Sequence, residues 1–375
     1  MTNVIGARVH EGHLAAVIGE DMLRNIYAGS VGVKIPVPIA GTPFYAVDGR
    51  IITEPARFQD TRGTVLYERP NMREAARPLA WDKGGRTLMP VAGGGFSSLS
   101  DLINEATNNG KSQMLYWFKG PSGTKVAGRG WSYWGLGTWP AIGAAGGTTG
   151  SGVACTSATT GALKMQNAAS GDTLHITTIT AYSNVTATAL LLYDRLWDMT
   201  HTMTVDPRST DGTAPSRYQA ATTAPGNFLS GQVTTVLPAA TPTLTCDYVD
   251  QDGNNTTGPA FSTIASAAAV NSIPFTAQVW AYPLDPADTG IRAMQNSANG
   301  FNLSAAMASG VVTWFIGHPL VFMPITASGG IFIDGINSAF NLQRVYDDAC
   351  LAFLEPLAGQ TTTTTYHGFI EMVSG

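Results

Sequence analysis

Hydrophobic and polar residues in the C-terminal two thirds of the chain are arranged as short strand-like runs. Residues 173–182 partly alternate between apolar and polar, and residues 186–194 form a stronger apolar run. Glycine turns such as Asp211-Gly212 and Asp252-Gly253 separate the runs. Further strands are expected at residues 113–118, 232–237, 243–249, 275–282, 311–316, 320–325 and 365–373. Many short strands with such turns predict a mainly β protein, built as a β-sandwich or jelly roll.

Helical signals are few and short. Ser98 and Asp101 form a capping-box pattern that predicts a helix over residues 99–109, closed by Gly110. Apolar residues between Leu14 and Ile26 recur at helical spacing and predict a second short helix. Residues 336–354 combine features typical of a helix with features typical of a strand, so the sequence is compatible with either.

The N-terminal quarter differs from the rest of the chain. Residues 31–95 contain recurrent prolines, which exclude a long helix and predict an extended, loop-rich segment. We therefore divide the chain into an N-terminal arm, residues 1–95, and a β-sandwich body, residues 96–375, with a Gly- and Trp-rich loop at 120–152. The arm is expected to lie on a partner surface and to hold it through Arg50, Arg57, Arg62, Arg69, Arg73 and Arg77, although a solvated surface remains the alternative.

Charge is scarce, and the shortage lies in the body. Only 13% of the 375 residues are charged, against about 25% in a typical soluble domain. Residues 151–375 contain six basic side chains, whereas residues 1–90 contain eleven. A charge-poor body suits a protein whose surface is shared with neighbours in a large assembly. The net charge of −5 gives no pull toward nucleic acid, and the absence of an 18-residue apolar run gives no expectation of a membrane-spanning helix.

The chain offers little metal or redox chemistry. Cys155, Cys246 and Cys350 are far apart and form no CxxC pair, which argues against a disulfide framework or a structural zinc site and favours three small buried thiols. The N-terminus lacks the apolar stretch of a signal peptide, so we expect synthesis in a reducing cytoplasm. His10 and His13 are spaced one residue too closely for the zinc motif H-E-x-x-H.

An acidic turn resembles the start of a calcium loop. Asp250, Asp252 and Asn254 fit its first positions, but Asn255 and Phe261 replace the required glycine and glutamate. A hairpin turn is the favoured interpretation, and a weak cation site at Asp250 and Asp252 stays open. Motifs for a serine nucleophile, a phosphate-binding loop or an acid–base pair are missing. We therefore predict no catalytic residue, metal or cofactor, and a protein that is not an enzyme.

A cluster of aromatic residues is the most distinctive local feature. Four of the eight tryptophans fall within residues 117–139. Tryptophan is enriched in cores and at subunit interfaces, and the surrounding glycines let its rings approach a backbone. We expect a core or interface role, with Trp131, Trp134 and Trp139 as candidate partner-binding residues. Stacking on a glycan is the alternative.

Several phrases in residues 170–330 resemble structural proteins of tailed-bacteriophage virions. These phrases are Asp288–Met294, Phe301–Gly310 with the strands that follow to residue 325, Leu190–Trp197, Pro215–Tyr218 and Tyr248–Gly253. The resemblance implies a viral structural protein of the capsid, in particular a decoration (cement) protein. Such proteins commonly use β-sandwich domains and sit as trimers over junctions between major capsid subunits.

The resemblance sets the functional expectation. The partners would be the major capsid protein and further copies of this chain in a homotrimer, with no nucleic acid and no membrane. The protein would be made in the host cytoplasm and reside on the capsid surface of the virion. Two alternatives remain: a major capsid protein, which requires a long spine helix that the pattern does not predict, and a tail-fibre or receptor-binding module that contacts glycans.

Overall fold

The computed structural model describes a series of short strands in the N-terminal region and most of residues 95–375. In the body the undescribed positions are 145, 149, 186–187, 261, 277, 326–328, 337–341 and 359–360. The chain separates into two compact units, Met1–Thr87 and Leu88–Gly375.

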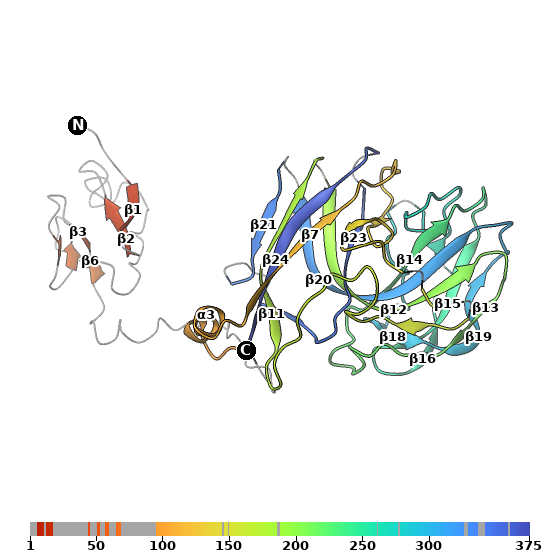
Figure 1. The fold of residues 1–375 in the computed structure, drawn as a ribbon, viewed down its shortest axis with the longest axis horizontal. Helices are drawn as coiled ribbons and strands as arrows, with labels where there is room; N and C mark the ends of the chain where they lie inside the picture. The colour runs from red at the N-terminus through yellow and green to blue at the C-terminus, as the bar shows by residue number, and fades with distance from the viewer. Residues whose placement is uncertain are drawn as a thin grey trace. The chain divides into compact units, whose positions relative to one another are not determined.

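The body is mainly β and contains three layers of antiparallel strands (Figure 1). We call the layers the outer, central and third sheets. Two separate hydrophobic clusters lie on the two sides of the central sheet. This layering confirms the predicted β-sandwich character of the body and adds a sheet to it.

The outer sheet has six strands. The helix α3, which precedes β7 in the chain, packs against one end of the sheet. The strands follow the order β21 (Ile331–Asp334), β11 (Leu174–Ser183), β24 (Tyr366–Ser374), β7 (Ser112–Lys119) and β9 (Thr138–Trp139), with β22 (Gln343–Val345) also paired to β11. α3 (Leu99–Thr107) begins as predicted, because the Ser98 hydroxyl accepts a hydrogen bond from the Asp101 amide. Leu102 packs with Phe96 and Val373 beneath it.

The central sheet is built on two 15-residue strands, β12 (Thr188–Thr202) and β20 (Val311–Ile325). Its order is β14 (Phe228–Thr235), β20, β12, β23 (Leu351–Glu355) and β8 (Trp131–Ser132), and β10 (Val153–Ala154) pairs with β12. Along β12, Leu190 and Leu192 enter the cluster beneath the outer sheet, whereas Leu191 and Tyr193 enter the other cluster. A strand buried on both faces reads as a nearly continuous apolar run, which explains the strength of this signal in the sequence.

The third sheet completes the body on the far side of the central sheet (Figure 1). Its strands are β13 (Arg208–Asp211), β19 (Asn296–Leu303), β15 (Thr243–Asp250) and β16 (Asn255–Thr257), and both β17 (Ser262–Thr263) and β18 (Ile291–Met294) pair with β15. Alternate residues of β15 face the core, among them Leu244 and Tyr248.

The strand predictions held for the long elements and failed in two places. Residues 275–282 form no strand; Phe275 makes a single bridge to Ile264, and the rest of the described segment is irregular. The two strands expected between residues 311 and 325 are one strand, which continues through Pro319 where its register with β12 shifts. The ambiguous segment 336–354 contains β22 and the start of β23 rather than a helix in its described part.

The N-terminal unit contains short hairpins. β1 (Gly6–His10) pairs with β2 (His13–Val17), β3 (Phe44–Tyr45) with β4 (Ile51–Ile52), and β5 (Arg57–Gln59) with β6 (Val65–Glu68). The helix predicted from Leu14 onward is therefore wrong over residues 14–17, because these residues belong to β2, which pairs antiparallel with β1 and places His13 opposite His10. The extended arm as a whole lies outside the described residues.

Candidate interaction surface

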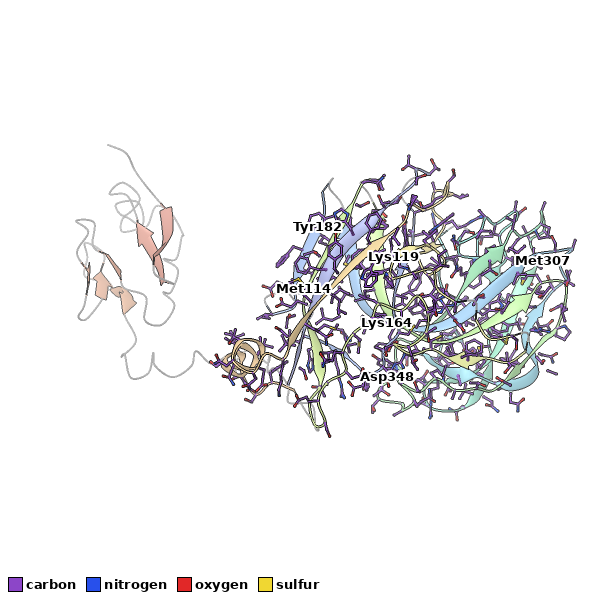
Figure 2. The ribbon with its side chains drawn as sticks, in the orientation of Figure 1. Met114, Lys119, Lys164, Tyr182, Met307 and Asp348 are labelled. Atoms are coloured by element: carbon purple, nitrogen blue, oxygen red, sulfur yellow. The ribbon has the colours of Figure 1, made fainter. Side chains whose placement is uncertain are left out.

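The outer sheet turns one face to the core and the other to solvent. On β7, Leu115 and Trp117 pack inward, whereas Met114 and Tyr116 point outward with 65% and 60% of their surface exposed. Figure 2 shows Met114 and Tyr182 on this side of the body. We call the outward residues the aromatic face: Met114, Tyr116, Phe118, Trp139, Tyr182, Phe332, His367 and Phe369.

One row of rings crosses four strands of the aromatic face. Cross-strand register places Tyr182 opposite His367, His367 opposite Phe118, and Phe118 opposite Trp139. The rings of Tyr182 and His367 stack, with centroids 5.3 Å apart and an interplanar angle of 16°. Phe118 and His367 are 6.3 Å apart. Cross-strand aromatic pairs stabilise a sheet, but here they also place apolar rings in water.

A second row and an acidic margin extend the aromatic face. Tyr116 lies opposite Phe369, whose amide donates a hydrogen bond to the Thr180 hydroxyl, and Thr180 lies opposite Phe332. Phe332 is 64% exposed. The next row carries two carboxylates, because Glu371 and Asp334 both pair with Thr178. The face therefore combines exposed aromatic rings with negative charge along one margin.

The three candidate tryptophans are placed differently. Trp131 and Trp134 are only 2% exposed and belong to the core, whereas Trp139 is 58% exposed at the edge of the aromatic face. Trp134 fits closely against backbone, since a Cβ on Gly143 would fall 2.2 Å from its indole nitrogen. A core role therefore applies to Trp131 and Trp134, and only Trp139 is accessible to a partner from the surface of this chain.

The Gly- and Trp-rich segment 120–152 is anchored by a buried lysine. Lys119 Nζ donates to the carbonyl oxygens of Leu136, Pro140 and Ala141 at 3.0, 2.9 and 3.3 Å. Burial lowers the pKa of this ammonium to about 8. Because Leu136, Pro140 and Ala141 flank Trp139 in the sequence, these contacts tie the segment that carries Trp139 to the end of β7.

Buried ion pairs are the polar feature that the sequence did not reveal. Lys125 and Glu355 form a pair whose side chains are 1% and 0% exposed. Arg217 binds Asp194 through two contacts of 2.7 Å, and burial raises the pKa of Asp194 although the guanidinium opposes the shift. A charged residue in a strand, such as Asp194 at the end of the apolar run 186–194, was the available signal.

Arg195 is a further buried cation. Its Nε donates to Asp198 at 3.0 Å, and its guanidinium lies 4.8 Å from the ring of Trp134 and 4.3 Å from that of Phe315. Burial lowers the pKa of the Arg195 guanidinium, but the charge of Asp198, together with Tyr193 and Cys155, outweighs burial, so the pKa is raised. The ring of Trp134 thus packs over the buried guanidinium of Arg195 in a cation–π contact.

The acidic turn is a hairpin between β15 and β16. The Asp250 carboxylate accepts hydrogen bonds from the amides of Asp252 and Asn254, each at 2.8 Å, and from the Asn254 side chain at 3.0 Å. Burial would raise the pKa of Asp250, but these hydrogen bonds outweigh it and hold the pKa below its usual value. The carboxylate is used by the turn, as the hairpin interpretation expects. Among the described residues no group of three or more His, Cys, Asp or Glu is positioned to hold a metal ion.

The remaining candidates fall elsewhere. Nothing is described of the side chains of Arg50, Arg57, Arg62, Arg69, Arg73 and Arg77, so their predicted contacts lie outside the described residues. In the part of the chain that the structure describes, no helix is long and apolar enough to cross a membrane.

The body also has an apolar cleft of about 490 Å3, lined among others by Phe228, Trp280 and Phe322. The side-chain amide of Asn227 in this cleft is already hydrogen-bonded, because its nitrogen donates to the Ile291 carbonyl and its oxygen contacts Nδ1 of His318.

Comparisons with models of protein families, with curated proteins and with solved structures found no match for this chain.

Proposed function

We propose that this chain is a structural protein of a tailed-phage virion, a decoration protein that binds the major capsid protein and stabilises the shell. The aromatic face carries the proposal. Monomeric soluble proteins rarely leave a row of adjacent aromatic rings in water, and such patches commonly mark protein interfaces. The exposed Trp139 and Tyr182 stand at the two ends of a row of four rings.

The chemistry of the body supports the same role. The buried cations Lys125, Arg195 and Arg217 are each paired with a carboxylate inside the fold, and the body contains few charged residues. The resemblance to virion proteins within residues 170–330 adds support. The proposed mechanism is mechanical: apolar area buried at a subunit junction contributes about 25 cal/mol per Å2, and contacts from several copies in a trimer act together.

The aromatic face would pack against capsid subunits that present apolar and basic groups. Basic groups would complement Glu371 and Asp334 at its margin, and aliphatic groups would cover the rings. The arginine-bearing arm would add contacts of its own to the shell. The proposed role requires no catalytic residue and no cofactor.

A cosedimentation experiment tests the proposal. The full chain is mixed with capsid shells that lack it, and bound protein is measured in the pellet. We expect binding by the native chain, a loss of at least tenfold in affinity for the double substitution Tyr116→Ser and Tyr182→Ser, and unchanged binding for Val236→Ser. Val236 is a matched control because it is 53% exposed outside the aromatic face. A native chain that stays monomeric and does not bind shells would overturn the proposal.

Exposed aromatic rings also favour a second candidate, a receptor-binding module that contacts glycans. Trp139 and Tyr116 present open ring faces of the kind that stack on sugars. Retention on a glycan array that is lost in Trp139→Ala, together with no binding to shells, would favour this candidate.

A further inference from the structure

Two of the three cysteines meet at one edge of the longest central strand. β10 and β23 both pair with β12, on the edge opposite β20. Cys155 directly follows β10, and its amide donates to Leu196 at 2.9 Å. Cys350 directly precedes β23, and its carbonyl accepts from the Arg195 amide at 2.8 Å. The two cysteines, 195 positions apart in the sequence, therefore occupy consecutive places along the same edge.

The two cysteine side chains lie close enough to interact. The thiol of Cys350 contributes to the raised pKa of the Cys155 thiol, and both side chains are buried. Consecutive places along a strand edge differ by about 3.3 Å of rise. A disulfide spans a Cα separation of roughly 4.4–6.8 Å, so neighbouring places along one strand edge are suited to forming one.

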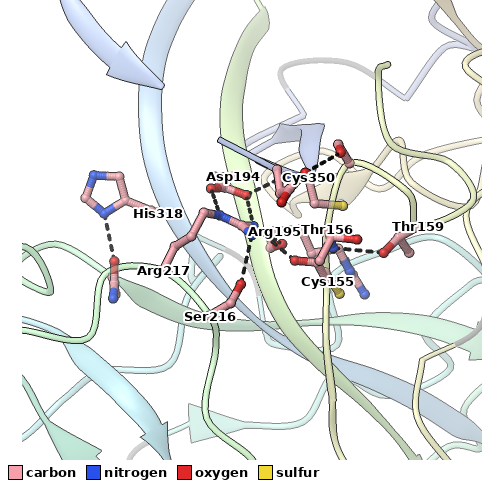
Figure 3. A network of polar contacts seen from close by, with 12 residues as sticks. Cys155, Thr156, Thr159, Asp194, Arg195, Ser216, Arg217, His318 and Cys350 are labelled. Atoms are coloured by element: carbon pink, nitrogen blue, oxygen red, sulfur yellow. Dashed lines mark hydrogen bonds and ion pairs between the residues drawn. The ribbon is translucent and has the colours of Figure 1, made fainter. Parts of the chain in front are cut away.

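The Asp194–Arg217 ion pair holds the two cysteine backbones in register. Arg217 Nη2 donates to the Cys155 carbonyl at 3.0 Å and to Asp194 Oδ1 at 2.7 Å. The same Asp194 oxygen accepts from the Cys350 amide at 2.8 Å. Figure 3 shows this chain of contacts, with both cysteines beside Asp194 and Arg195. Because the ion pair is buried, separating either segment from it would leave a buried charged group without one of its hydrogen bonds.

We infer that Cys155 and Cys350 are an oxidative cross-linking site, which closes to a disulfide when the chain meets a peroxide. One thiolate attacks a peroxide oxygen, the O–O bond breaks, and a sulfenic acid forms as hydroxide leaves. The sulfur of the second cysteine then attacks the sulfenic sulfur. The S–O bond breaks, and the hydroxyl group leaves with the thiol proton as water. The two sulfurs lose two electrons in total, and one peroxide is reduced to two waters.

The surroundings make this reaction selective and slow. Hydrogen bonding to Cys350 and burial both raise the pKa of the Cys155 thiol, so little thiolate is present at neutral pH and the rate should increase with pH. Cys246 is also buried but lies on β15 of the third sheet, away from this edge. The cross-link would join the segment after β10 to the segment before β23 and stabilise the body by restricting the unfolded chain. The inference does not depend on the proposed virion role.

Peptide mapping of the folded full chain tests the inference. The protein is treated with hydrogen peroxide, remaining thiols are alkylated in denaturant without reductant, and peptides are identified by mass spectrometry. We expect one linked pair of peptides, Cys155 with Cys350, about 2 Da lighter than the two reduced peptides together, with Cys246 alkylated. Sulfoxide formation at Met114, which is 65% exposed, reports that the peroxide has acted.

Controls separate the native pairing from random oxidation. Cys246→Ser should retain the cross-link, and Cys350→Ser should lose it together with the rise in unfolding temperature that peroxide produces. The wild-type map decides the question even if Cys350→Ser fails to fold. Unlinked Cys155 and Cys350 in a sample with oxidised Met114, or a link that involves Cys246, would overturn the inference.

Discussion

The ammonium nitrogen of Lys125 lies 2.9 Å from Oε2 and 3.0 Å from Oε1 of Glu355, in a site closed to solvent. Two hydroxyl groups complete the site, since Tyr133 donates to Oε2 at 3.0 Å and Thr188 donates to Oε1 at 2.8 Å. Lys125 also donates to the Thr364 hydroxyl. The central sheet, the segment that follows β7 and the segment that precedes β24 thus meet at one ion pair.

Removing one partner of this pair should strongly destabilise the body. Lys125→Met leaves the Glu355 carboxylate buried without its cation, which typically costs about 3–5 kcal/mol. Denaturant titration followed by tryptophan fluorescence measures the change in the free energy of unfolding. The exposed Lys164 supplies the control, and Lys164→Met should change stability by less than about 0.5 kcal/mol.

The double substitution Lys125→Met and Glu355→Met separates the loss of the pair from the isolated charge. It should cost less than Lys125→Met alone, because both charges are removed together. A single substitution that leaves the free energy of unfolding unchanged would show that the pair contributes nothing to the fold.

Stability should fall as the pH drops because of His175. This ring is 6% exposed, its Nδ1 lacks a hydrogen-bond partner, and it lies opposite Arg344. Burial, with the charge of Arg344, lowers its pKa from 6.5 to about 4. Between these values the unfolded chain binds a proton that the folded chain does not. The histidine therefore costs up to about 3 kcal/mol of stability as the pH falls from 6.5 to 4.

The histidine contribution is measured as a difference between variants. Denaturant titrations at pH 7 and pH 4.5 should show a smaller loss for His175→Leu than for the native chain. His367→Gln, at an exposed position on the aromatic face, should lose as much as the native chain. Equal losses in all three proteins would contradict a buried, neutral His175.

The sequence predicted the elements whose cause is local and missed those whose cause is tertiary. The Ser98 cap and the apolar run of β12 are written in adjacent residues, so both were found. Residues 275–282 have the apolar composition of a strand, but in their described part they pair only through the bridge of Phe275 to Ile264, and they fill the core irregularly. A cross-strand row such as Tyr182, His367 and Phe118 depends on register between distant segments, which alternation along one strand does not encode.

The acidic turn should be indifferent to calcium. Asp250→Ala removes three hydrogen bonds of the hairpin and should lower stability by about 1–3 kcal/mol. Asp252 is exposed and should tolerate the same change. Thermal unfolding in calcium and in a chelator should give the same midpoint for the native chain. A higher midpoint in calcium that disappears in Asp250→Ala would instead establish a cation site.

Trp134 and Trp139 should differ sharply when each is replaced by alanine. Trp134→Ala uncovers the buried Arg195 guanidinium and leaves a cavity, so it should cost about 3–5 kcal/mol in denaturant titrations. Trp139→Ala removes a ring that is 58% exposed, so stability should change by less than about 1 kcal/mol. The second variant should nevertheless bind shells more weakly in the cosedimentation assay, because its ring ends the exposed row. A Trp139→Ala protein that is destabilised as much as Trp134→Ala would mean that the ring supports the fold, and the aromatic face would then lose its principal argument as a binding surface.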